Sequence, residues 1–192
     1  MKKRLLACLL AAVMTASLFA ACSSKEDTAP SEGNSQNQED TATEEAKEPA
    51  LADVVQAVKD AYGENYIPSM EITQQELADV CGITTENIEE VIAEGPMMSG
   101  HVDRLFAIKA VEGKGEDVEK EVATYQKVLQ EDTLMYPMNI AKVQASQVVR
   151  HGDYVFFVML GAFDEESTTE EAQQVFADEQ TKIGTDAIAS FF

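Results

Sequence analysis

The feature that most constrains the fold is an uninterrupted apolar run, YVFFVML, at residues 154–160. Its aromatic and β-branched residues favour a strand, and a strand that is apolar on both faces needs partner strands on both edges and cover on both faces. Directly before it stands His151-Gly152-Asp153, which is typical of a tight hairpin turn. Residues 142–150, KVQASQVVR, alternate as a half-buried strand does. These segments predict a hairpin whose second strand lies in the middle of a sheet.

A third strand and a crossover helix complete the predicted sheet. Residues 102–111 are rich in strand formers, and residues 115–134 have an apolar helical stripe with acidic residues in the first turn, where the helix dipole favours them. Because such crossovers are right-handed, the strands 102–111 and 142–150 should run parallel, with 154–160 antiparallel between them. We therefore expect an α+β domain with a small three-stranded sheet, mixed or antiparallel, in a split β-α-β unit packed with helices.

Four further helices are predicted, over residues 51–63, 73–82, 85–95 and 167–191. Capping boxes at 73–76 and 167–170 mark two of the starts. The third helix must end before Pro96, because proline excludes its predecessor from the α region. In the last helix we expect these side chains to face inward: Ala172, Val175, Phe176, Ile183, Ala187 and Phe191.

The N-terminal segment predicts export and lipid anchoring. Residues 1–4 are basic, and residues 5–21 are apolar and end in small residues. This pattern predicts a signal peptide over residues 1–21. The apolar run is shorter than the ~20 residues that a membrane-spanning helix needs. Leu18 to Cys22 resembles the lipobox of bacterial lipoproteins, with Phe19 where leucine is usual. We expect Cys22 to carry diacylglycerol and acyl chains such as palmitate, which hold the protein on the extracytoplasmic face of the cell membrane. The alternative is an ordinary signal peptide with an incidental Cys22.

Residues 22–50 contain hardly any apolar side chains and predict a disordered acidic linker, followed by a single domain over 51–192. The chain has 14 Lys and Arg against 35 Asp and Glu, a net charge of −21. Nucleic acids and anionic headgroups both attract basic surfaces, so we expect no nucleic-acid partner and a membrane contact made by the lipid alone.

Residues 82–160 resemble a family catalogued as domain of unknown function 4358, found in small lipoproteins of Gram-positive anaerobes. The resemblance is carried by GITTENIEEVIAEGPMMSGHVDRLFAIKA (82–110), by Asp117-Val118 and by GDYVFFV (152–158). It implies an α+β lipoprotein of the cell envelope, and it brings no known activity, cofactor or site residue.

Both histidines stand two residues before an aspartate, His101 before Asp103 and His151 before Asp153. If the pairs met, they would offer four metal ligands or an acid–base site. We expect neither a metal nor a cofactor, because the first pair enters a strand, the second occupies a turn, and no zinc-ligand spacing is present.

Two other features invite a functional interpretation. Met97-Met98 either lines a pliable binding groove or fills the gap between helix and sheet, and we prefer the packing role. Cys81 lies in an apolar stripe with Leu77 and Val80 and is expected to be a buried small hydrophobe. The serines lack a G-x-S-x-G elbow, and no glycine-rich phosphate loop is present.

These observations favour a non-enzymatic envelope lipoprotein, an accessory or binding module for another envelope protein or a small ligand. The alternative is an envelope hydrolase or metal-dependent enzyme that uses the His101/Asp103 and His151/Asp153 pairs. The two hypotheses differ in whether those four side chains converge in one cleft.

Overall fold

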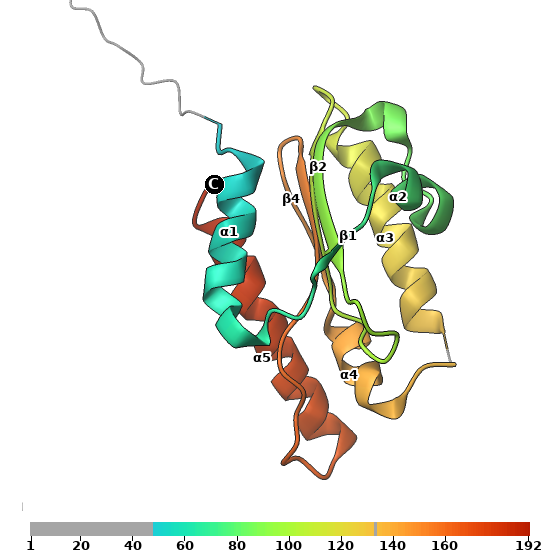
Figure 1. Cartoon of the computed structure of the whole chain (residues 1–192), viewed down its shortest axis with the longest axis vertical. Coiled ribbons are helices and arrows are strands. Elements are labelled where there is room, and N and C mark those ends of the chain that lie inside the picture. The colour runs from blue at the N-terminus through green and yellow to red at the C-terminus, as the bar shows by residue number, and fades with distance from the viewer. Residues whose placement is uncertain (1–47, 133) are drawn as a thin grey trace, which may run out of the picture. The chain divides into compact units, whose positions relative to one another are not determined.

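The computed structural model describes residues 48–132 and 134–192 (Figure 1). The predicted signal peptide, Cys22 and most of the predicted linker lie outside the described residues. The helices are α1 (Leu51–Tyr62), α2 (Gln74–Cys81), α3 (Gly115–Glu131), α4 (Pro137–Ala145) and α5 (Glu170–Ala189). The strands are β1 (Met70–Glu71), β2 (Ile88–Gly95), β3 (Arg104–Ala110), β4 (Gln147–His151) and β5 (Tyr154–Met159). No helix among the described residues is long and apolar enough to cross a membrane.

The sheet has five strands in the described chain, in the order β1-β2-β3-β5-β4, and all neighbours are antiparallel. The predicted centre is confirmed, because β5 lies between β3 and β4. Both neighbours are antiparallel to β5, so β3 and β4 run parallel to each other, and α3 and α4 connect them. The three-strand count was wrong, since β1 and β2 extend the sheet beyond β3.

Strand β2 occupies the segment for which a helix was predicted. Its pairing with β3 shifts register between Ile88 and Glu90. Such a bulge adds a residue to one strand and breaks the period-two alternation. Ile88 and Val91 therefore face the same side of the sheet, three residues apart, while Ile92 faces the other. The apolar spacing imitates a helical stripe for this reason.

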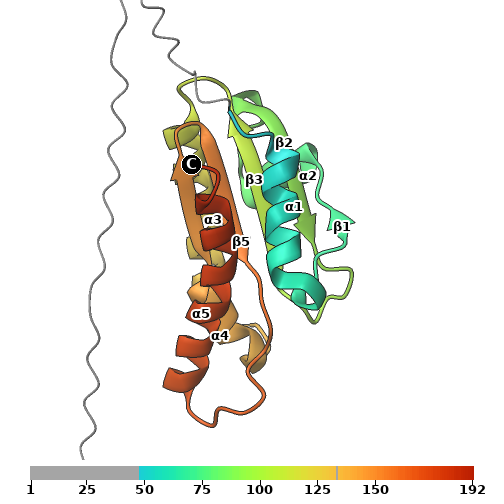
Figure 2. The same ribbon diagram turned by 90° about the vertical axis from the view of Figure 1, so that its left-hand side faces the viewer.

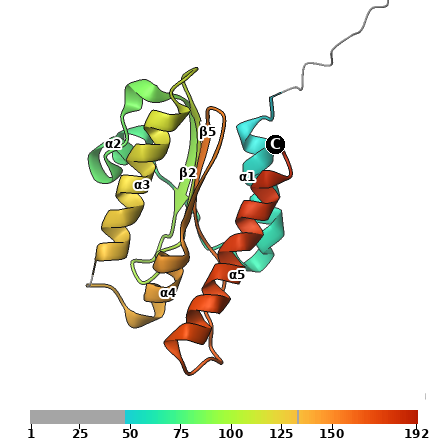
Figure 3. The same ribbon diagram turned by 180° about the vertical axis from the view of Figure 1, so that it is seen from behind.

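Helices cover both faces of the sheet in three layers. Figures 1 and 3 show α1 and α5 on one face and α2 and α3 on the other. Along β5, Val155, Phe157 and Met159 pack toward α2 and α3, and Phe156 and Val158 pack toward α1 and α5. Both halves of the core are thus built on the apolar run from which the fold was predicted.

Helix α4 was not predicted, and its last residues, 142–145, had been assigned to a strand. Pro137 stands in its first turn, where proline is well tolerated. The buried positions are Asn139, Lys142, Val143 and Ala145. Two of these four are polar, so the buried face of α4 lacks the apolar periodicity that identifies a helix from sequence.

Helix α5 begins as a capped helix, with the Thr169 hydroxyl accepting from the Ala172 amide. The predicted inward face is only partly right, because Val175 is exposed and the buried residues are Ala177, Thr181, Gly184 and Ile188. A Cβ atom at Gly184 would lie 2.9 Å from both the Tyr62 hydroxyl and Val158 Cγ1. Small residues on this face let α5 approach α1 and β5 closely.

Candidate functional site

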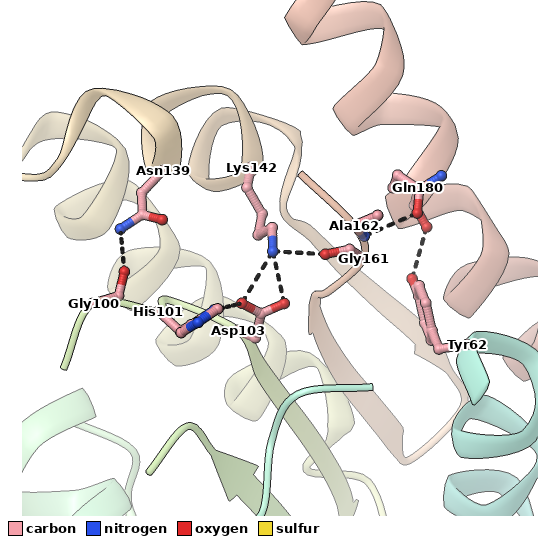
Figure 4. A network of polar contacts seen from close by, with 9 residues as sticks. All are labelled: Tyr62, Gly100, His101, Asp103, Asn139, Lys142, Gly161, Ala162 and Gln180. Carbon is pink, nitrogen blue, oxygen red and sulfur yellow. Dashed lines mark hydrogen bonds and ion pairs between the residues drawn. The ribbon is translucent and has the colours of Figure 1, made fainter. Parts of the chain in front are cut away.

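The candidate site lies at one end of the sheet, which we call the Lys142 end, where the chain enters β3 and leaves β5. Asp103 immediately precedes β3, Lys142 projects from α4, and Gly161 follows β5 (Figure 4). Lys142 Nζ donates to Asp103 Oδ1 at 2.8 Å, to Asp103 Oδ2 at 3.0 Å and to the Gly161 carbonyl at 2.7 Å. The two charged side chains are 4% and 0% exposed. The ammonium group is therefore fully engaged inside the protein.

The surroundings of Lys142 combine opposing electrostatic effects. Burial lowers the pKa of the Lys142 amine, and the adjacent Asp103 carboxylate acts against that shift. The ring of Phe163 lies 3.8 Å from Nζ, a cation–π contact that also favours the charged form. Burial therefore opposes the charged form of Lys142, while the carboxylate and the aromatic ring favour it.

Two neighbouring polar side chains connect this pair to the loop before β3. His101 Nδ1 lies 3.6 Å from Asp103 Oδ2, longer than a hydrogen bond, and the His101 ring packs against Phe163. Asn139 Nδ2 donates to the Gly100 carbonyl at 3.1 Å, while its Oδ1 is buried without a partner. Helix α4 thus fixes the loop that carries His101.

Helices α1 and α5 hold the turn that follows β5. The Ala162 amide donates to Gln180 Oε1 at 3.0 Å, and the Tyr62 hydroxyl donates to the Gln180 carbonyl at 2.8 Å (Figure 4). Burial raises the pKa of Tyr62, so its hydroxyl remains a donor at physiological pH. Gly161 has φ of 123°, a value that favours glycine. The turn that contains the Gly161 carbonyl therefore contacts α4 through Lys142 and α5 through Gln180.

Three open pockets of about 590, 180 and 540 Å³ surround this network. Phe163 lines all three, and Met138 lines two of them. Met97 and Met98 line the third and are 72% and 61% exposed. The preferred packing role for these methionines was therefore wrong, because they lie on the surface.

The second predicted pair lies at the other end of the sheet, which we call the hairpin end. In the β3–β5 register, Arg104 faces Met159 and Lys109 faces Tyr154, so the start of β3 and the β4–β5 turn are at opposite ends. His151 stacks on Phe192 with ring centroids 4.4 Å apart. The structure therefore does not bring the two pairs together, and within residues 48–132 and 134–192 no three potential metal ligands cluster.

Asp153 ties the β4–β5 turn to the start of α3. Its carboxylate accepts from the Gly113 and Gly115 amides, each at 3.0 Å, and these bonds lower the pKa of Asp153. Cys81 is buried, as predicted, and burial raises the pKa of its thiol. The residue that sequence reasoning missed is Lys142, and the signal that could have revealed it is a lone lysine between Ile140 and Val143 in a segment opened by a proline.

Comparison with known proteins places the chain in a family and assigns no role to the site. No curated protein and no solved structure matches the chain. The family model described as "Domain of unknown function (DUF4358)" matches residues 61–160, from the end of α1 through β5, and includes His101, Asp103 and Lys142. The match spans more than half of the chain, which therefore belongs to the DUF4358 family.

Proposed function

We propose that this protein is a non-enzymatic binding module of the cell envelope, anchored by a lipid on Cys22 to the extracytoplasmic face of the membrane. The basic start, the apolar run and the lipobox-like Leu18 to Cys22 support the address. The acidic composition supports a membrane attachment through lipid, because a surface of that charge does not attract anionic headgroups.

The observation that carries the binding role is that the Lys142 ammonium group uses its full hydrogen-bonding capacity inside the protein. A lysine that acts as a nucleophile or base needs a free amine that can reach its substrate. Here the ammonium donates three hydrogen bonds to Asp103 and Gly161 and is covered by Phe163. The charged groups therefore support the loops around them, and the open pockets beside them favour recognition over chemistry.

The position of the first described residues supports a surface directed away from the membrane. The Tyr154 hydroxyl donates to the Pro49 carbonyl at 3.1 Å, at the hairpin end. Figure 2 shows α1 starting at that end and α4 lying at the opposite one. A chain anchored upstream of Pro49 would leave the Lys142 end free to meet a partner.

The anchor is tested by growing producing cells with a clickable fatty acid. Label should enter the wild-type protein and should be absent from Cys22→Ser, which should appear in the medium. Cys81→Ser is the matched control, because it removes a buried thiol and should leave labelling unchanged. Equal labelling and equal membrane retention of Cys22→Ser would contradict the proposed address.

The binding role is tested by photo-cross-linking in intact cells. A cross-linking amino acid at position 98 should give a defined conjugate, since Met98 is exposed at the Lys142 end. The same amino acid at Val128, exposed on α3, is the control and should give none. Equal conjugate yields at the two positions would contradict a specific binding surface.

A further inference from the structure

The three pockets at the Lys142 end form a continuous surface, because neighbouring pockets share lining residues. Phe163 belongs to all three, Met138 joins two, and Phe176 lines the pair under the 161–167 turn. Met97 and Met98 complete the apolar part. We call the five residues Met97, Met98, Met138, Phe163 and Phe176 the methionine trough.

The methionine trough combines pliable side chains with a fixed backbone. Met97, Met98 and Met138 are all more than half exposed, and exposed apolar groups that cluster mark interaction sites. The unbranched methionine side chain adapts its shape to a partner. The backbone beneath is held by the Asn139–Gly100 hydrogen bond and by the Lys142–Asp103 pair. Such a surface can accept an apolar ridge without prior rearrangement of the fold.

Carboxylates border the trough on one side. Asp164, Glu165 and Glu166 line the pocket under the 161–167 turn. Hydrogen bonds from Ser167, and then from the Glu166 amide, lower the pKa of Asp164 and keep it ionised. Asp164 Oδ2 is buried without a hydrogen-bond partner. Among the described residues that line the three pockets, the only lysine is Lys142, which is turned inward. The border is therefore negative, and its exposed carboxylates are those of Glu165 and Glu166.

We infer that the methionine trough binds a basic amphipathic segment of a second protein. The apolar face of that segment lies on the methionines, as in helix-in-groove recognition. Its lysine or arginine side chains pair with the exposed Glu165 and Glu166. The same carboxylates repel anionic headgroups and therefore disfavour an anionic membrane as the occupant. The inference rests on the proposed binding role and names the surface and the chemistry of the partner.

The probe is a fluorescent synthetic peptide in which leucine and lysine alternate with helical spacing. Two control peptides carry glutamate in place of lysine, or the same composition in scrambled order. The protein is the mature chain, residues 22–192 with Cys22→Ser, so that the result does not depend on lipidation. Fluorescence anisotropy should show saturable binding of the Leu/Lys helix and much weaker binding of both controls.

Substitutions in the trough separate apolar docking from simple charge attraction. Met97→Ser/Met98→Ser should weaken binding at least about fivefold, the size expected when interface anchors are truncated. Val80→Ser/Val128→Ser removes two apolar side chains that are equally exposed elsewhere and should leave affinity unchanged. If the two double variants bind equally well, the trough is not the docking surface and the inference fails.

The acidic border is tested by reversing its charge. Glu165→Lys/Glu166→Lys should weaken the Leu/Lys peptide at least about tenfold and flatten its salt dependence. Asp79→Lys/Glu86→Lys makes the same charge change at exposed sites in another region and serves as the control. Equal losses in both variants would reduce the effect to net charge and overturn the inference.

Vesicles distinguish a membrane from a protein partner. Phosphatidylglycerol vesicles should not retain the unlipidated chain. Retention that is lost in Met97→Ser/Met98→Ser, together with no peptide binding, would make the trough a lipid contact and overturn the inference. If the peptide does not bind while Cys22 is labelled normally, only the inference about the trough is refuted. If the peptide binds while Cys22 is not labelled, only the proposed anchor is refuted.

Discussion

The two ends of the sheet carry the same sequence pattern, a histidine two residues before an aspartate, and use it differently. At the Lys142 end, Asp103 is fully buried and holds a lysine from a helix that is distant in sequence. At the hairpin end, Asp153 is partly exposed and accepts hydrogen bonds from two backbone amides at the start of α3, which are similarly distant in sequence. The difference teaches that spacing alone identifies no site, because the partners supplied by the fold decide the role of each carboxylate.

The sharpest test of this difference removes the cation at the Lys142 end. Lys142→Met leaves Asp103 buried and unpaired, so the free energy of unfolding should fall by about 3–5 kcal/mol. Urea denaturation measures this change. Adding Asp103→Leu removes the orphaned charge and should restore most of the loss.

The control for that test is an exposed pair. Lys182→Met breaks the contact with Asp186 on the surface of α5, and its cost should stay within about 0.5 kcal/mol. Comparable losses for Lys142→Met and Lys182→Met would show that burial does not distinguish the two pairs.

At the hairpin end, backbone crowding should produce the next largest effect. A Cβ atom at Gly115 would lie 2.3 Å from the Gly152 carbonyl oxygen and 2.9 Å from Asp153 Cα, so Gly115→Ala must displace the turn. We expect a loss of about 1–3 kcal/mol in thermal or urea unfolding.

Gly100 offers the matched position at the Lys142 end. A Cβ atom there would meet nothing within 4 Å, so Gly100→Ala should change stability by no more than about 0.5 kcal/mol. A larger loss at Gly100 than at Gly115 would contradict the packing described for both ends.

The pH dependence of the free energy of unfolding should reveal the contribution of the Asp153 carboxylate. Its pKa in the folded protein lies below the ordinary value of about 3.9, so its stabilising contribution is complete above that value and is lost as the pH falls through the folded pKa. Unfolding free energies measured between about pH 6 and pH 2 should show a gap between wild type and Asp153→Asn that narrows as the pH falls. A gap of constant size would mean that the charge of Asp153 does not stabilise the turn.

The smallest effect is expected at the exposed methionines. Met97→Ser/Met98→Ser should alter the free energy of unfolding by about 0.5 kcal/mol or less, because both side chains lie on the surface. Met159→Ser, in the buried strand β5, is the contrast and should cost about 2–5 kcal/mol in the same urea titration. A large loss from the double variant would restore the packing role for Met97 and Met98.

The centre of the fold could be predicted because β5 is apolar at every position, and a strand of that kind has few possible environments. The same reasoning failed at β2, where a bulge near Glu90 put residues three apart on one face. It failed again at α4, where Asn139 and Lys142 occupy buried positions that a periodicity argument reserves for apolar residues.

The candidate site was only half visible from sequence. The ionisable side chains of His101 and Asp103 drew attention to them. The sequence suggested His151 and Asp153 as their partners, whereas the structure pairs Asp103 with Lys142. The partner of Asp103 lies 39 residues away, and no local pattern records a contact over that distance. Exposure of Met97 and Met98 was likewise decided by tertiary packing, since the predicted helix before Pro96 is an extended strand.

Tyr154 has a practical consequence for engineering. Its hydroxyl meets Pro49, and its ring lies 5.2 Å from that of Phe192, so both ends of the described chain share one neighbour. A short peptide joining residue 192 to residue 48 should therefore permit circular permutation of the domain. The joining peptide would sit beside the β4–β5 turn, at the opposite end of the sheet from α4.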